Sequence, residues 1–92
     1  MTDVRNGVNR LDRELVELLA RRFAFMRAAA RIKPNREQVR DEGRKAEVIA
    51  AAREAAIELG IPDDFVASVW EQLVETSIAY EMQEWDRLRA HR

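Results

Sequence analysis

The 33 residues that precede the first proline carry one long stripe of apolar side chains. Its members lie three or four residues apart, except for one step of seven. They are Val4, Val8, Leu11, Leu15, Leu18, Phe25 and Ala29. This spacing is typical of one face of an α-helix, and Pro34 ends the helix because a residue before proline avoids the helical region. We therefore expect a helix from about Asp3 to Lys33.

The rest of the chain predicts two more helices after a loop over residues 34–38. The second helix should run from about Asp41 to Leu59, with Gly60 as its C-terminal stop. Its inner face is expected to consist of Val48, Ile49, Ala52, Ala55, Ala56 and Leu59.

The third helix should open with Pro62 in its first turn, where proline suits the backbone and the acids that follow suit the helix dipole. It should extend to about Arg89. The side chains expected to point inward are Val66, Trp70, Leu73, Val74, Trp85 and Leu88. The sequence therefore predicts a single all-α domain of three helices over residues 1–92.

The length of the first helix predicts self-association. At 1.5 Å per residue it is about 45 Å long, and 92 residues provide too little chain to cover it. Pairing of the long helices between two chains in an intertwined homodimer is the economical solution. On the pattern alone, a plain coiled-coil or helical adaptor dimer explains the chain equally well.

Composition excludes several classes of function. Sixteen basic and 17 acidic residues give a net charge of −1, so nucleic acid and anionic membranes are not expected partners. The chain has no cysteine, and its one histidine, His91, is best explained as a solvated residue near the C-terminus. There is no phosphate-binding glycine loop, metal cluster or catalytic triad, and we expect no cofactor. No segment resembles a signal peptide or membrane span, so we expect a cytoplasmic protein.

Four polar side chains lie on the predicted apolar faces. Arg22 fills the step of seven, and Lys33 continues the stripe on the same side of the helix. On the third helix, Ser77 and Glu81 interrupt the apolar spacing. Because a buried cation is costly unless it is paired, the residues form either a core salt bridge, such as Glu81 with Arg22, or a polar pocket. Such a pocket would suit a small dicarboxylate, which arginine binds through two parallel hydrogen bonds.

The chain resembles the all-α chorismate mutases and their relatives, the isochorismate-pyruvate lyases, over nearly its whole length. The matching segments are Val4–Arg5, Arg10–Asp12, Leu18–Arg22, Lys33, Val39–Asp41 with Arg44, and Gly60–Trp85. The resemblance implies a dimer of three-helix chains with two sites, each built from both subunits. It also implies an activity: the rearrangement of chorismate to prephenate, which needs no nucleophile or proton transfer.

The resemblance also implies roles for individual residues. Arg5 would reach into the site of the other subunit, while Arg22 and Lys33 would hold the substrate carboxylates and its ether oxygen. Arg5 and Arg22 lie about 25 Å apart along one helix, so both can contact one small ligand only in a dimer.

Further members of the implied site come from the second and third helices. Asp41 and Arg44 would line the pocket, and Ser77 would contact a carboxylate. Glu81 would match the Gln or Glu that donates a hydrogen bond to the ether oxygen.

Some residues depart from the mutase pattern. Lys45 stands where many mutases carry a glutamate that accepts a hydrogen bond from the ring hydroxyl, and lysine has no acceptor. The loop before Val39 is one residue shorter than in a typical bacterial mutase. Residues 29–33 and Trp85 are closer to the lyases. We expect a chorismate mutase; the alternatives are an isochorismate-pyruvate lyase and a non-catalytic helper protein with the same fold.

Overall fold

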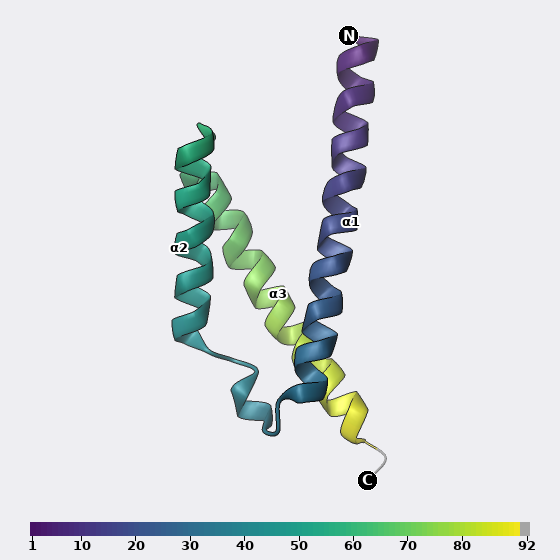
Figure 1. The fold of residues 1–92 in the computed structure, drawn as a ribbon, viewed down its shortest axis with the longest axis vertical. Helices are drawn as coiled ribbons and strands as arrows, with labels where there is room; N and C mark the ends of the chain where they lie inside the picture. Colours follow the sequence, from purple (N-terminus) through teal and green to yellow (C-terminus); the bar gives the residue numbers. More distant parts are fainter. Residues whose placement is uncertain (91–92) are drawn as a thin grey trace.

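The computed structural model describes residues 1–90 and consists of helices joined by short connections (Figure 1). The three long helices are α1 (Thr2–Ile32), α2 (Glu42–Leu59) and α3 (Asp63–Arg89), and a short 3₁₀ helix, η1 (Arg36–Gln38), lies between α1 and α2. No strand occurs within residues 1–90. The predicted all-α fold is confirmed, whereas His91 lies outside the described residues.

The helix ends follow local chemistry and lie within one residue or so of the predicted positions. Asp41 caps α2 by accepting a hydrogen bond from the backbone N–H of Arg44 at 3.0 Å. Gly60 ends α2 with a φ of 73°, a left-handed conformation that favours glycine. The prediction for Pro62 was wrong by one position, because with ψ at 112° it precedes the first turn of α3 as the N-cap. The predicted loop over residues 34–38 contains η1, a single turn that the breaker residues did not indicate.

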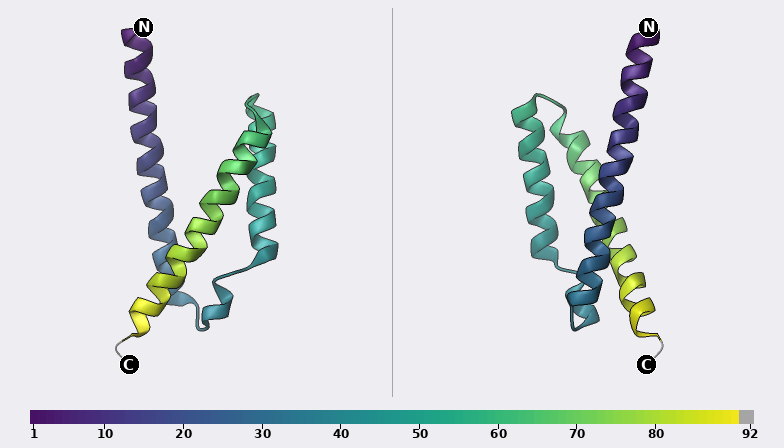
Figure 2. Two further views of the ribbon diagram at one scale, coloured as in Figure 1. Left: turned by 180° about the vertical axis from the view of Figure 1, so that it is seen from behind. Right: turned by 45° about the vertical axis from the view of Figure 1, so that its right-hand side comes forward.

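The helices form an open V rather than a closed bundle. Helices α2 and α3 run antiparallel, and α3 crosses the C-terminal half of α1 (Figures 1 and 2). In every view the first turns of α1 extend beyond the other helices. The radius of gyration is 16.2 Å, against about 12 Å for a compact domain of this length. A single chain therefore leaves much of α1 uncovered.

The core is small and lies where α2, α3 and η1 meet. Val39, Val74 and Ile78 are buried there. Partly buried side chains that pack against them are Val48, Ile49, Trp70, Met82 and Trp85. Several residues predicted to point inward are exposed within one chain: Phe25 is 73%, Leu59 76% and Leu88 37% exposed, and Ala55 is exposed as well.

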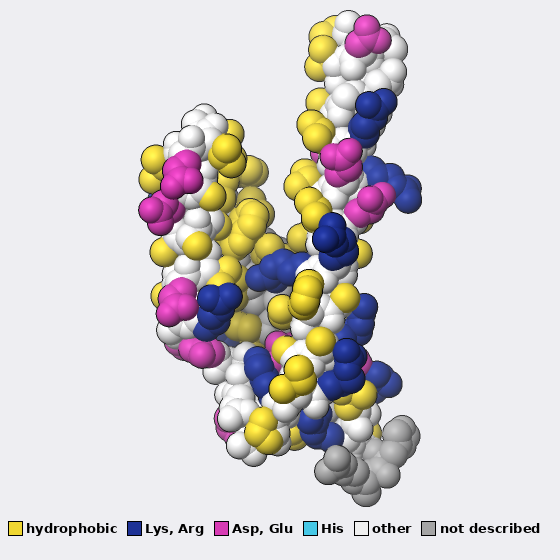
Figure 3. Space-filling view, viewed as in Figure 1, with side chains coloured by type: hydrophobic (Ala, Val, Ile, Leu, Met, Phe, Trp, Pro, Cys, Tyr) yellow, Lys and Arg dark blue, Asp and Glu magenta, His cyan; other side chains and the backbone are white. Residues whose placement is uncertain are grey.

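The apolar stripe of α1 is exposed along its N-terminal half. Val4, Val8, Leu11, Leu15 and Leu18 are each about half exposed or more. In the space-filling view, hydrophobic side chains follow the edge of α1 that faces the gap and also gather at the tip of the α2–α3 pair (Figure 3). None of the described helices combines the length and apolar character needed to cross a membrane.

Candidate active site

A pocket of about 370 Å³ lies where α1, η1, α2 and α3 converge, a size within the range of about 300–1,000 Å³ that is usual for small-molecule sites. The structure brings seven of the eight predicted site residues to its wall: Arg22, Lys33, Asp41, Arg44, Lys45, Ser77 and Glu81. Apolar side chains, Val48 and Ile78 among them, complete the lining. Polar groups placed on an apolar wall are the arrangement expected of a binding site.

Arg22 enters the pocket from the middle of α1. Its Nη1 donates a hydrogen bond to the Ser77 hydroxyl, which in turn donates to the Leu73 carbonyl at 2.7 Å. Burial, together with the nearby charge of Arg44, lowers the pKa of Arg22 from its usual value. No acidic side chain of residues 1–90 forms a salt bridge with Arg22. Its charge is therefore available to an anionic ligand.

Lys33 and Glu81 form the other polar wall. The Lys33 Nζ lies 2.7 Å from Oε2 of Glu81, whose side chain is only 5% exposed. Oε2 is buried and accepts no hydrogen bond from the described residues, so the Lys33 ammonium meets it as an ionic partner. Because a buried carboxylate is costly unless it is paired, this ion pair explains how Glu81 can lie inside the pocket. The salt-bridge alternative for Arg22 was thus wrong about the partner, because Glu81 contacts Lys33.

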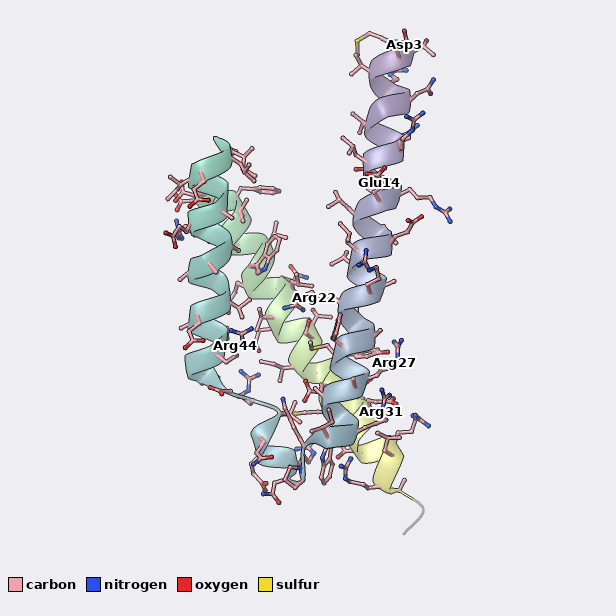
Figure 4. All side chains as sticks on the ribbon, viewed as in Figure 1. Asp3, Glu14, Arg22, Arg27, Arg31 and Arg44 are labelled. Carbon is pink, nitrogen blue, oxygen red and sulfur yellow. The ribbon has the colours of Figure 1, made fainter. Side chains whose placement is uncertain are left out.

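The start of α2 contributes Asp41, Arg44 and Lys45 to the pocket wall, and these side chains differ in how closely other residues bind them. Asp41 is occupied in capping the helix. The Arg44 guanidinium is 3.5 Å from a carboxylate oxygen of Glu47, and the Arg44 side chain is 70% exposed. Figure 4 shows Arg22 and Arg44 extending toward each other from α1 and α2.

Lys45 lines the pocket, but its charge is turned toward α3. Its Nζ lies 2.7 Å from Glu71 and 2.9 Å from Glu75, and both carboxylates raise its pKa. Glu75 also binds Arg40 through both of its oxygens. The ammonium is thus held by protein carboxylates rather than free for a ligand.

Arg5 is not part of the pocket in this chain. It lies in the first turns of α1, which project away from the other helices (Figure 1). Seventeen residues of continuous helix separate it from Arg22, about 25 Å along the axis. Within one chain, Arg5 and Arg22 are therefore too far apart to contact the same small ligand.

Gln38 is a pocket residue that the sequence did not indicate. It belongs to η1, and the turn places it beside Val39 at the pocket wall. No periodicity marks a single turn of 3₁₀ helix, so its position could not be read from spacing. Among the described residues, no group of three His, Asp or Glu side chains could hold a metal.

The cations without a close acidic partner indicate the ligand that the pocket can accept. Glu81 faces Lys33, and Glu71 with Glu75 neutralise Lys45. Arg22 has no salt bridge within residues 1–90, and Arg44, on the α2 side of the pocket, has only its exposed contact with Glu47 at 3.5 Å. Two guanidinium groups so placed suit a compact molecule with two carboxylates.

The comparisons with known proteins agree with this geometry. Residues 4–82 match the family model described as "Chorismate mutase type II". The isochorismate pyruvate lyase of Pseudomonas aeruginosa is 27% identical over 89 residues, which cover 97% of this chain and 88% of the lyase. The matched segment contains every residue of the pocket wall, and on that match the chain belongs to the chorismate mutase type II family.

Proposed function

We propose that this chain converts chorismate to prephenate in the pocket between α1, α2 and α3. The observation that carries the proposal is the pair formed by Lys33 and the buried Glu81, 2.7 Å apart in the wall of a pocket that Arg22 also lines. In the rearrangement the ether C–O bond breaks as a C–C bond forms, and the ether oxygen gains negative charge. Donors aimed at that oxygen stabilise the transition state.

The other side chains would hold the substrate in its reactive shape. Arg22 and Arg44 would bind the two carboxylates, so that the two ends of the molecule are folded together. Holding reacting atoms in a near-attack geometry supplies much of the catalysis when no covalent step is needed. Protonated Glu81 and the Lys33 ammonium would be the two donors to the ether oxygen.

The proposed enzyme is a homodimer, with each site completed by a second copy. Arg5 is about 25 Å along the helix from Arg22, so it would contribute to the pocket of the other chain. The exposed apolar stripe of α1 supports this arrangement, because Leu11 and Leu15 are 59% and 58% exposed in one chain. Light scattering is expected to give about twice the 10.7 kDa chain mass. A folded, active monomer would overturn the shared site.

Isochorismate-pyruvate lyase activity is the second candidate, and one observation favours it. The similar protein from Pseudomonas aeruginosa is described as a lyase of that kind. Cleavage of isochorismate to salicylate and pyruvate breaks the same ether C–O bond, so the same donors would serve. Lys45 stands where mutases carry an acceptor for the ring hydroxyl, but its ammonium is bound by Glu71 and Glu75. Lys45 is therefore compatible with chorismate and with isochorismate.

Separate incubations with chorismate and isochorismate test the proposal. We expect prephenate from chorismate, with Lys33→Ala nearly inactive. Arg36→Ala is the matched control, because Arg36 is an exposed cation that binds Asp86 outside the pocket. Salicylate and pyruvate from isochorismate alone would establish the lyase instead. Consumption of neither substrate would contradict both reactions and favour a helper protein.

A further inference from the structure

The C-terminal turn of α1 has backbone carbonyls that the helix itself cannot satisfy. The Ala30 carbonyl would normally accept a hydrogen bond from the N–H of residue 34, but residue 34 is proline and has none. Ala30 is fully buried, with 0% exposure. Lys33 follows in an extended conformation, with φ −66° and ψ 125°. An unpaired buried carbonyl is costly, so this turn needs donors from elsewhere.

The last turns of α3 supply these donors. Arg89 donates from Nη1 to the Ala30 carbonyl at 3.1 Å and from Nη2 to the Lys33 carbonyl at 3.0 Å. The Trp85 indole N–H donates to the same Lys33 carbonyl at 3.0 Å. The Arg89 guanidinium also lies 4.1 Å from the centre of a Trp85 ring, a cation–π distance. Three donors thus fix two carbonyls at the point where α1 ends.

The residue fixed in this way is the one whose side chain enters the pocket. The Lys33 carbonyl is bound by Trp85 and Arg89, while its ammonium lies 2.7 Å from Glu81. Ser77, Glu81, Trp85 and Arg89 follow one another at intervals of four residues, and we call them the α3 column. Within this column, Trp85 and Arg89 bind the backbone carbonyl of Lys33, and Glu81, one turn before Trp85, contacts the Lys33 ammonium.

We propose that Trp85 and Arg89 are positioning residues, which aim the Lys33 ammonium by fixing the backbone from which it extends. The inference rests on the proposed function for its effect on catalysis, although the contacts themselves do not depend on it. A catalytic group must be held within about 0.5 Å of its productive place, and misplacement by about 1 Å can cost about 10²-fold in rate. Helix α1 holds Lys33 only through its N–H, which donates to the Ala29 carbonyl at 2.9 Å, so it is the Lys33 carbonyl that depends on the donors of α3.

Kinetics on Arg89→Ala test the effect on catalysis, with Arg87→Ala as the matched control. Arg87 is an exposed arginine two residues away that binds Glu84 within α3. We expect Arg89→Ala to lower kcat about tenfold or more with a smaller change in KM, and Arg87→Ala to stay within about twofold. Trp85→Phe keeps an aromatic ring but loses one donor, so its loss should be smaller. Equal rates for the two arginine variants would overturn the proposal.

A second measurement separates positioning from general loosening and does not require activity. Lys33 and Lys45 are the chain's two lysines, so acetylation by acetic anhydride can be followed at both by mass spectrometry. Arg89→Ala should speed acetylation of Lys33 and leave Lys45, which is held by Glu71 and Glu75, unchanged. Arg87→Ala should change neither. If both lysines react faster in Arg89→Ala, the variant loosens the whole chain and the positioning role is wrong.

The two experiments also separate this inference from the proposed function. Failure of the wild-type protein to consume chorismate or isochorismate would contradict the function, whereas selective acetylation of Lys33 would still establish the backbone contact. An active wild-type protein with unselective acetylation would contradict the inference alone. Selective acetylation with an unchanged kcat would show that the contact orders Lys33 without serving catalysis, which also overturns the proposed role.

Discussion

Glu81 is 4% exposed, and one of its carboxyl oxygens receives no hydrogen bond from the described part of the chain. A carboxyl group can donate to an ether oxygen only while it is protonated, since its anion has acceptors alone. In the proposed reaction, the charge state of this side chain would therefore decide whether it assists or opposes cleavage of the ether bond. A glutamine at the same place would donate whatever the pH.

We predict that Glu81→Gln retains activity, because the amide donates a hydrogen bond to the ether oxygen whatever the pH. Glu81→Ala should lose about 10²–10³-fold in kcat/KM, the usual cost of one missing donor to a developing oxyanion. Steady-state kinetics of the wild type and the two variants measure the effect. Glu81→Ala as active as the wild type would leave Glu81 only as the partner of Lys33.

Between elements, a chain of charges links the start of α2 to α3 beside their apolar contact. Arg40 precedes α2 and binds Glu75 of α3, which shares Lys45 with Glu71. This network explains how a lysine can occupy a pocket wall without presenting its charge to the ligand. It also changes what a substitution at Lys45 should do.

We predict that Lys45→Glu destabilises the fold. The new carboxylate would face Glu71 and Glu75, and like charges repel. Pairing the change with Glu71→Lys should restore much of the melting temperature, because the charges are then exchanged. Thermal unfolding measures the stability, and the ratio of prephenate to salicylate formation measures specificity. A single variant as stable as the wild type would mean that Lys45 contributes little to the α2–α3 contact.

The same network predicts a response to acid. Hydrogen bonds from Arg40 and Lys45 lower the pKa of Glu75 from 4.5 to about 2. Because the folded state favours the carboxylate, this stabilisation is present above pH 4.5 and is lost as the pH falls toward about 2. The side chain is 40% exposed, so salt should weaken the effect. Urea unfolding at several pH values should show a smaller acid loss for Glu75→Gln than for the wild type; parallel curves would contradict the prediction.

At the scale of the molecule, the chain is 56 Å long and 15 Å thin, and its apolar residues are spread over surfaces that face nothing within one copy. Arg5 lies on the projecting part of α1, and Lys33 lies at the other end. A two-fold dimer would bring Arg5 of one chain close to Lys33 of the other chain. A substitution of Arg5 in one subunit, or of Lys33 in the other, would then damage the same site.

We predict that Arg5→Ala and Lys33→Ala are each nearly inactive alone and regain activity when mixed. After random exchange of subunits, half of the dimers are mixed, and each mixed dimer has one intact site. About a quarter of all sites should therefore be restored. Activity assays after mixing measure the recovery, and native mass spectrometry verifies the exchange. Exchange without recovery would place the two residues in separate sites.

Periodicity in the sequence was enough to predict the three helices, because proline, glycine and apolar spacing act locally. It also located Arg22, Lys33, Ser77 and Glu81, since polar side chains on an apolar face are visible in the pattern. The partners of these side chains were not predictable: Glu81 faces Lys33 instead of Arg22, and Lys45 turns to Glu71. Such choices depend on how the helices cross, which spacing within one helix does not encode. Trp85 and Arg89 had one local signal, the missing N–H of Pro34, but the sequence does not say which donor replaces it.

The α3 column has a consequence for how this chain can change in length. Its four side chains face one way only because each interval is four residues, and one inserted residue would rotate everything beyond it by about 100°. An insertion between Ser77 and Glu81 would therefore turn the carboxyl, the indole and the guanidinium away together, however conservative the added residue. The turn at Gly60, which is exposed, carries no such constraint and should accept extra residues. In helix α3 the intervals between these four side chains therefore matter as much as their identities, because an insertion within the column shifts all later members around and along the helix.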